Sequence, residues 1–414
     1  MRFQTSAERL PSPLPPGHFA GCGHAVRARV PLAEARPSPN HVHPTLTDLI
    51  AVPAGPWKAL HARAIEPNGY YDPDWAVAVA RHARGHGGAQ ALLAWDPSNQ
   101  NRLTGLLPVR WSRQAMTLPL PMLVAWSGYA PLTVPALDRD CAQRAAGALL
   151  DAAREQGARA LLLPTVAIEG AAFDAVRAAS SEQGLSIKIL RRFQRAGLDA
   201  SQDADTALHS ALGGKKLKEL RRQRRRLEDT GALLLKVSTT PAEVAAALEC
   251  FLLLEQKGWK GLCGTSLGQD EGNAAFIRKA AIALAERARF EIVSLTRAGT
   301  LIASGLILRD ADRAYFLKIA IDEDESRASP GVQLTLDITR HLCADTRVAF
   351  ADSLADSEHP MIDRVWRARI EIADVFITLR PRDPVAHAIR NLVMARYAAI
   401  DCVRTLRRMK EKLK

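Results

Sequence analysis

Long apolar runs and paired cysteines are both missing from this sequence of 414 residues. The longest apolar stretches, around 118–126 and 158–163, fall well short of the roughly 20 residues that cross a bilayer as a helix. No apolar segment of the kind found in secretory signals occurs near the first residue, so we expect no such signal. The six cysteines are scattered without a C-x-x-C pair, which predicts reduced thiols, no metal site and a cytoplasmic chain.

Three catalytic signatures are also missing. The sequence contains no G-x-S-x-G elbow, no H-E-x-x-H motif and no Walker phosphate-binding string. Each of these motifs positions a group that its chemistry needs, namely a nucleophilic serine, two zinc ligands or backbone amides around a phosphate. The serine hydrolase, zinc protease and NTPase classes therefore have no support.

Charge and composition indicate the class of partner. The formal net charge is +12, from 56 Lys and Arg against 44 Asp and Glu. This excess favours anionic partners such as nucleotides, phosphorylated carriers, nucleic acid or anionic lipid. Apolar residues (47%) and charged residues (24%) are at the levels of folded soluble proteins, and the length predicts two domains.

The first part of the chain differs from the rest. Residues 1–44 hold eight prolines and show neither a helical nor an alternating apolar period, so we expect a disordered arm.

From residue 45 onward, one order of elements occurs twice. Each copy contains two helices and three strands in succession, followed by helix, strand, helix and strand, which predicts an α/β class and a duplicated domain. In the first copy we expect helices at 56–66, 73–86, 138–156 and 169–182, and strands at 89–95, 103–111, 122–126, 158–163 and 185–193. In the second we expect helices at 241–256, 271–289, 330–344 and 360–367, and strands at 232–237, 292–295, 301–308, 314–321, 348–351 and 371–379.

This order, with three strings in the second copy, resembles the GNAT acyltransferase fold. The strings are KKLKELRR at 215–222, GWKGLCGT at 258–265 and SPG at 329–331. Two copies in one chain resemble the CelD-like (cellulose-biosynthesis) acetyltransferases, which are related to the Fem-type peptidyltransferases. The resemblance covers about 45–380 and implies tandem GNAT-like domains, each a mixed, mostly antiparallel sheet flanked by helices. The expected division is an arm at 1–44, a GNAT-like domain without cofactor at 45–200, an acyltransferase domain at 205–380 and a basic helix at 384–414.

The SPG string lies where a helix is expected to begin. A helix N-terminus carries unpaired N–H groups and a partial positive charge, which suit a diphosphate. Proline lacks an N–H, and glycine lets a phosphate approach the backbone closely. An ordinary N-cap is the other interpretation. The candidate residues for binding acetyl-CoA or another acyl-CoA are Arg327, Ser329, Pro330, Gly331 and Val332.

The matching turn of the first copy contains Asp138 and Asp140. These acids would repel a phosphate, so we expect only the second copy to bind cofactor and the first to form a wall of the acceptor cleft.

Residues 215–226 form the most basic segment, with eight cations among twelve residues. At helical spacing, one stripe holds Lys215, Lys218, Arg222 and Arg225, while leucines 217, 220 and 227 form another. A solvated surface helix is one interpretation. An anionic acceptor bound by Lys215, Lys218 and Arg222, such as a nucleotide-linked or lipid-linked sugar, is the other, and RNA stays open.

Lys257, Trp259 and Lys260 lie in a loop with three glycines. We predict that they bind substrate, with the indole stacked on a sugar or an adenine. The indole filling a gap between the domains is the alternative.

Acyl transfer needs a base for the proton of the acceptor. Asp352 and His359 follow a strand of the second copy, at the edge where α/β sheets bind ligands, and are the candidate catalytic residues. Asp356 and Glu358 are alternatives, because such loops are often polar without any chemistry.

The last segment, 384–414, is expected to be a helix whose final eleven residues hold six cations. Its basic end suits the helix dipole, and its apolar stripe either packs on the domain or contacts a membrane peripherally.

The main hypothesis is an acyl-CoA-dependent acyltransferase that modifies an amine or hydroxyl of a sugar-like or envelope-related acceptor in polysaccharide biosynthesis. The alternatives are a Fem-like transferase that uses aminoacyl-tRNA, and a non-catalytic subunit of a polysaccharide-synthesis complex.

Overall fold

The computed structural model describes residues 45–357 and 359–412. The arm expected at 1–44 and Glu358 lie outside these residues. Five of the six cysteines are described, and all five are free thiols, as their scatter predicts.

The N-terminal half has the predicted order of elements, together with two short strands and a short helix that the sequence pattern did not indicate. Helix α2 begins at Pro73 because the carboxylate of Asp72 accepts the N–H of Asp74 and proline supplies the first turn. The elements are β1 (Leu46–Asp48), α1 (Ala54–Ala62), α2 (Pro73–His82), β2 (Gln90–Asp96), β3 (Asn99–Trp111), α3 (Ser112–Met116), β4 (Met122–Ala125), β5 (Ala136–Leu137), α4 (Ala142–Glu155), β6 (Ala160–Ala167), α5 (Ala171–Glu182) and β7 (Ile187–Asp199).

The C-terminal half also follows the predicted order. The capping box between Thr240 and Glu243 is present at the start of α7, as predicted. The elements are α6 (Ala204–Asp229), β8 (Leu233–Ser238), α7 (Pro241–Lys257), α8 (Trp259–Leu262), α9 (Glu271–Ala285), β9 (Phe290–Arg297), β10 (Thr300–Asp310), β11 (Arg313–Ile321), the 3-10 helix η4 (Glu323–Ala328), α10 (Pro330–Ala344), β12 (Phe350–Asp352), α11 (Ile362–Val365), β13 (Ala368–Thr378) and α12 (Pro384–Lys412).

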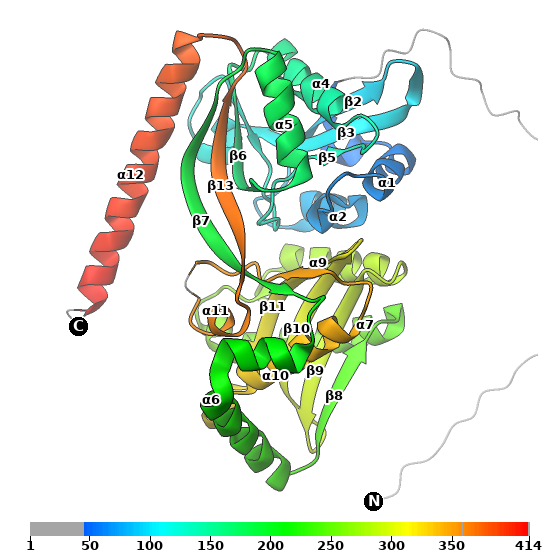
Figure 1. Ribbon diagram of the computed structural model, residues 1–414, viewed down its shortest axis with the longest axis vertical. Helices are drawn as coiled ribbons and strands as arrows, with labels where there is room; N and C mark the ends of the chain where they lie inside the picture. The colour runs from blue at the N-terminus through cyan, green and yellow to red at the C-terminus, as the bar shows by residue number, and fades with distance from the viewer. Residues whose placement is uncertain (1–44, 358, 413–414) are drawn as a thin grey trace, which may run out of the picture. The chain divides into compact units, whose positions relative to one another are not determined.

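One sheet runs through both halves in the order β1-β2-β3-β4-β6-β13-β7-β12-β11-β10-β9-β8. The last strand, β13, is inserted between β6 and β7 of the N-terminal half, and β7 and β13 run side by side in Figure 1. The end of β7 in turn pairs with β12, Gly197 lying opposite Asp352. The predicted ranges 45–200 and 205–380 do not anticipate this exchange, because strand propensity does not report which sheet a strand joins.

The sheet opens beside β11. Strands β11 and β12 pair in parallel only over Arg313–Tyr315 and Phe350–Asp352. Leu306 of β10 pairs with Lys318 and Ile307 pairs with Phe316, so Leu317 is a bulge in β11. In the described residues, no strand pairs with β11 on the β12 side after Tyr315. We call this side of residues 317–321 the open edge.

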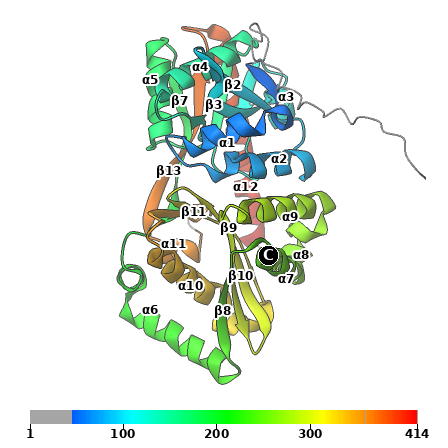
Figure 2. The same cartoon turned by 90° about the vertical axis from the view of Figure 1, so that its right-hand side faces the viewer.

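Two pairs of helices cover the C-terminal part of the sheet (Figure 2). Helices α7 and α9 pack on one face, and α6 and α10 lie on the other. The leucines that the sequence predicts as the packing stripe of α6, Leu217, Leu220 and Leu227, are buried there.

A buried ion cluster joins the two halves. The guanidinium of Arg289 donates to Asp72 (2.5 Å) and to Nε2 of His61 (2.8 Å), and it also binds Asp310. Arg287 donates to the other oxygen of Asp72 (2.7 Å). Burial lowers the pKa of His61 from 6.5 to about 4, against the opposing charge of Asp72. Nε2 of His61 also lies 3.1 Å from Oδ1 of Asp310, so whether it accepts from Arg289 or donates to Asp310 depends on the tautomer of the ring.

Helix α12 packs through Ile389, Val393 and Tyr397 on a cluster that includes residues of β4, β6 and β13. Leu392 and Val403 are exposed, and the predicted membrane contact stays a prediction. No helix within the described part of the chain has the length and apolar character to cross a membrane.

Candidate active site

A cleft of about 220 Å³ lies at the open edge of β11. It is formed by the end of α7, α8, the end of β11, the start of α10 and the segment before α11. The lining residues are Leu254, Glu255, Gly258, Trp259, Lys260, Ile319, Ala320, Ile321, Glu323, Gly331, His359 and Met361.

Glycine 261 shapes one wall of this cleft. A Cβ at Gly261 would lie 1.8 Å from the carbonyl oxygen of Gln256. Only glycine therefore lets α8 fold back so closely on the end of α7. The tight turn brings Lys260 inward, where its Nζ donates to the carbonyl of Ile319 (2.7 Å) on β11.

A buried carboxylate holds two lysines beside the cleft. Glu255 is 2% exposed, and its Oε1 accepts from Nζ of Lys318 at 2.6 Å. Nζ of Lys260 lies 3.6 Å from the same oxygen. The second oxygen of Glu255 accepts the N–H of Leu267 (2.8 Å). One carboxylate thus faces two amino groups, and we call these three residues the Lys318–Glu255–Lys260 cluster.

The two lysines have different surroundings. Burial lowers the pKa of Lys260, the nearby charge of Lys318 lowers it further, and Glu255 opposes both effects. An amine with a lowered pKa has a larger neutral fraction and can accept a proton. Lys318 donates directly to Glu255. The cluster therefore places two amino groups with different surroundings beside one carboxylate.

Two other predicted substrate residues lie at the rim. Nζ of Lys257 binds Asp322 (3.1 Å) and Asp324 (2.8 Å), so its charge is already paired. The backbone N–H of Trp259 donates to Glu323 (2.6 Å), while its indole is 56% exposed. Of the predicted trio, Lys260 alone reaches the interior.

The start of α10 is packed by side chains. Gly331 is buried, and a Cβ there would lie 3.2 Å from Cγ2 of Ile321. The N–H groups of Val332 and Gln333 donate to the carbonyl of Ser329 (2.9 and 3.1 Å). Since Pro330 has no N–H, few donors of this turn are left for a ligand.

Four acids precede the same turn: Asp322, Glu323, Asp324 and Glu325. They outnumber the two cations that pair with them, Lys257 and Arg297. The repulsion that the sequence indicates for Asp138 and Asp140 thus applies more strongly here. The expected set of Arg327, Ser329, Pro330, Gly331 and Val332 does not fit a diphosphate.

The two candidate bases line different cavities. Asp352 is buried and binds Nη2 of Arg195 (2.7 Å), and burial raises its pKa against the charge of that arginine. It lines a cavity of only about 50 Å³. His359 lines the cleft, but its Nδ1 accepts the N–H groups of Met361 and Ile362 (both 3.4 Å). The structure does not bring the two together, and their catalytic role stays a prediction.

The cations of α6 are exposed. Lys215, Lys218 and Arg222 have no carboxylate within ion-pair distance in the described residues, whereas Arg224 binds Asp337 (2.8 Å). Helix α6 contacts both η4 and α10, beside the cleft. These exposed cations are available for an anionic partner, and the contact with such a partner stays a prediction.

Sequence reasoning missed Glu255 and Lys318. Glu255 directly follows the apolar run FLLL in α7, and Lys318 is the one charge of YFLKIAI in β11. Charged residues are rarely buried unless they are paired. An acid at the end of one apolar run and a lysine inside another were therefore the available signal.

Residues 214–359 match the family model described as an acetyltransferase (GNAT) domain. The matched segment contains the whole Lys318–Glu255–Lys260 cluster, and the match supports acyl transfer as the class of reaction. It does not bear on the CelD-like type. Among proteins of curated function, none matches this sequence.

Two solved structures share the fold. The C-terminal domain of a candidate lysylphosphatidylglycerol synthetase from Agrobacterium fabrum is 13% identical with a TM-score of 0.50, over 82% of this chain and 95% of that one. FemX is 10% identical with a TM-score of 0.52, over 83% of this chain and 98% of that one. These likenesses confirm the predicted α/β class, a large mixed sheet flanked by helices.

Proposed function

We propose that this protein is an acyltransferase whose reaction takes place in the cleft at the open edge of β11. The observation that carries the proposal is the Lys318–Glu255–Lys260 cluster, a buried carboxylate with two lysines inside the segment that matches the acetyltransferase domain.

In the proposed reaction, an amine or hydroxyl of the acceptor attacks the carbonyl carbon of the acyl group. Lys260 takes the proton of the acceptor as general base. The ammonium of Lys318 stabilises the negative charge that develops on the carbonyl oxygen. The bond from that carbon to the sulfur or oxygen of the donor then breaks, and the proton on Lys260 passes to this leaving atom. Glu255 positions both lysines.

Two donors are candidates. Acetyl-CoA or another acyl-CoA is the donor that the family description suggests, but the residues at the start of α10 do not fit its diphosphate. The exposed cations of α6 favour the second candidate, an aminoacyl-tRNA, because a row of unpaired cations suits a polyanion. The resemblance to Fem-type enzymes implies the same donor.

The acceptor in this proposal is an anionic, sugar-like or envelope-related molecule. Trp259 supports it, because an exposed indole at the rim of a polar cleft can stack on a sugar ring.

The decisive experiment measures turnover and donor binding separately in the variants Lys318→Met, Lys260→Met and Lys257→Met. The first two should lower turnover by roughly 100-fold or more at unchanged donor affinity. Lys257→Met, at the rim, is the matched control and should stay within a few fold. Equal turnover in all three would refute the assignment.

Full complementation of a deletion strain by a Lys318→Met, Lys260→Met double variant would instead favour the non-catalytic subunit.

A further inference from the structure

A second cavity, of about 190 Å³, lies next to the cluster. We call it the apolar chamber. Trp75, Tyr129 and Pro131 of the N-terminal half line it, together with residues of α9, β10, β11 and the segment after β12. Among the described residues that line it, Lys318 is the one charged side chain.

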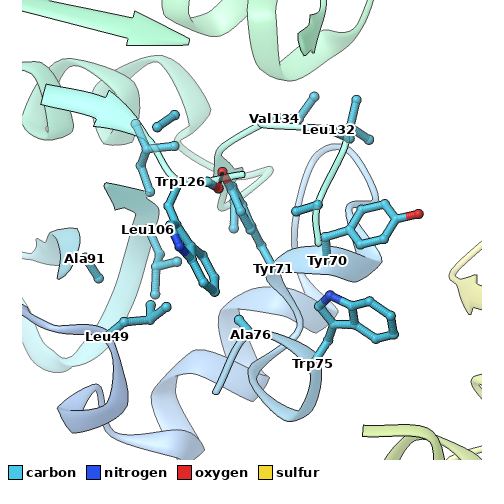
Figure 3. Close-up of a cluster of buried hydrophobic side chains, with 14 of the residues drawn as sticks. Leu49, Tyr70, Tyr71, Trp75, Ala76, Ala91, Leu106, Trp126, Leu132 and Val134 are labelled. Carbon is cyan, nitrogen blue, oxygen red and sulfur yellow. Dashed lines mark hydrogen bonds between the residues drawn. The ribbon is translucent and has the colours of Figure 1, made fainter. Parts of the chain in front are cut away.

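Aromatic rings form much of its wall. Phe276 of α9 meets Trp75 edge to face at 5.6 Å between ring centroids, and Tyr129 at 4.6 Å. Trp75 also packs against Tyr70 (5.7 Å), and Figure 3 shows these two rings side by side. Rings held from both sides in this way make a preformed wall whose shape does not depend on a ligand.

The chamber and the cleft share the cluster. Lys318 lines the chamber, and its Nζ binds Glu255, which lines the cleft. The bulge at Leu317 places that side chain in the chamber wall, next to Lys318. A carbonyl group held at Lys318 would therefore lie between an apolar space and a polar one.

We propose that the apolar chamber receives the apolar part of the transferred acyl group. This inference rests on the proposed function and specifies its substrate class. A carbonyl group at the cluster must extend its remaining atoms into one of the two spaces. Four titratable side chains, Glu255, Lys260, Glu323 and His359, lie among the apolar residues that line the cleft, whereas Lys318 is the one charged side chain among the described residues of the chamber wall. The apolar part of the group therefore fits the chamber better.

The size of the chamber indicates the size of the group. An apolar cavity of about 150 Å³ holds one benzene molecule. The chamber thus accepts an aromatic ring or a branched chain of similar size, while an acetyl group leaves it almost empty. Each buried methylene improves binding by a factor of about four. A hexanoyl group has four more methylenes than acetyl and should therefore be preferred by roughly 250-fold in kcat/KM.

The first experiment tests the chamber without a reaction. Benzene should raise the melting temperature of the wild-type protein, and a crystal soaked with it should show density beside Leu317. The variant Leu317→Trp should abolish the shift, whereas Leu234→Trp, at an exposed position of β8, should retain it. If Leu317→Trp does not fold, Leu354→Trp fills the same space from the segment after β12. No benzene in the chamber overturns the inference.

The second experiment compares acyl groups. Acetyl-CoA, hexanoyl-CoA and benzoyl-CoA form one arm, and tRNA charged with glycine, leucine or phenylalanine forms the other. Within the active arm, the wild-type protein should prefer the larger apolar groups and Leu317→Trp should prefer the smaller. Turnover that does not depend on the size of the acyl group would overturn this inference but not the proposed function. The same holds if Leu317→Trp changes only the size of the acceptor that is used. Benzene binding without turnover in either arm overturns the proposed function as well.

Discussion

Replacing His61 by glutamine should remove part of the acid sensitivity of the fold. In the ion cluster between the halves, the ring of His61 is buried, and its Nε2 lies within hydrogen-bond distance of Arg289 and of Asp310. Glutamine is neutral at every pH, and its amide offers both an acceptor for the guanidinium and a donor for the carboxylate. The variant should therefore lose only about 1 kcal/mol near pH 7.

The acid effect follows from the pKa of His61, which falls from 6.5 to about 4 on folding. Above pH 6.5 both the folded and the unfolded chain carry a neutral ring. As the pH falls below 6.5, the unfolded chain binds a proton that the folded protein does not bind until about pH 4. Stability is thus lost across this window. At about 1.4 kcal/mol for each pH unit, the wild-type protein should lose roughly 3 kcal/mol more than His61→Gln.

Urea unfolding, followed by tryptophan fluorescence at a series of pH values from about 7.5 to about 4.5, measures this difference. Other groups titrate in the same range, so the quantity of interest is the gap between the two curves. His209→Gln, at an exposed site on α6, is the control and should follow the wild-type curve. Parallel curves for wild-type and His61→Gln would show that His61 is not held neutral.

Three further predictions follow from the structure. Glu255→Gln leaves two lysines without their carboxylate, so thermal unfolding should show a loss of about 3–5 kcal/mol together with lost turnover. Thr240→Ala removes the capping box of α7 and should cost about 1 kcal/mol in urea unfolding without changing turnover. Replacing Lys215, Lys218 and Arg222 by glutamine should reduce the slope of log affinity for RNA against log salt by about one for each phosphate that is no longer neutralised, and an unchanged slope would exclude α6 as the RNA-binding surface.

Much of the fold was predictable because its signals are local. Pro330 predicts the start of α10, and the Thr240 capping box predicts the start of α7, since both act within one helical turn. The same locality explains what the sequence did not indicate about the fold. The apolar pattern of β13 predicts a strand, but its place between β6 and β7 depends on residues far away in the sequence.

The site was less predictable for a related reason. Whether Gly331 is accessible depends on Ile321 and Met361, which pack around it from other segments. Whether Asp352 is available depends on Arg195, far away in the sequence. Of the predicted loop residues, Lys260 reaches the cluster because Gly261 lets the turn close on α7. Partners of this kind cannot be read from spacing along the chain.

The exchange of β13 also orders events during synthesis. Synthesis up to residue 199 supplies every strand of the N-terminal half except β13. Strand β13, which lies between β6 and β7 in the sheet, ends only at Thr378. Until that segment leaves the ribosome, the edges of β6 and β7 are unpaired and can bind one another or another chain. Expression of residues 45–200 alone should therefore give an aggregating fragment, and its recovery should improve when residues 205–380 are produced in the same cell.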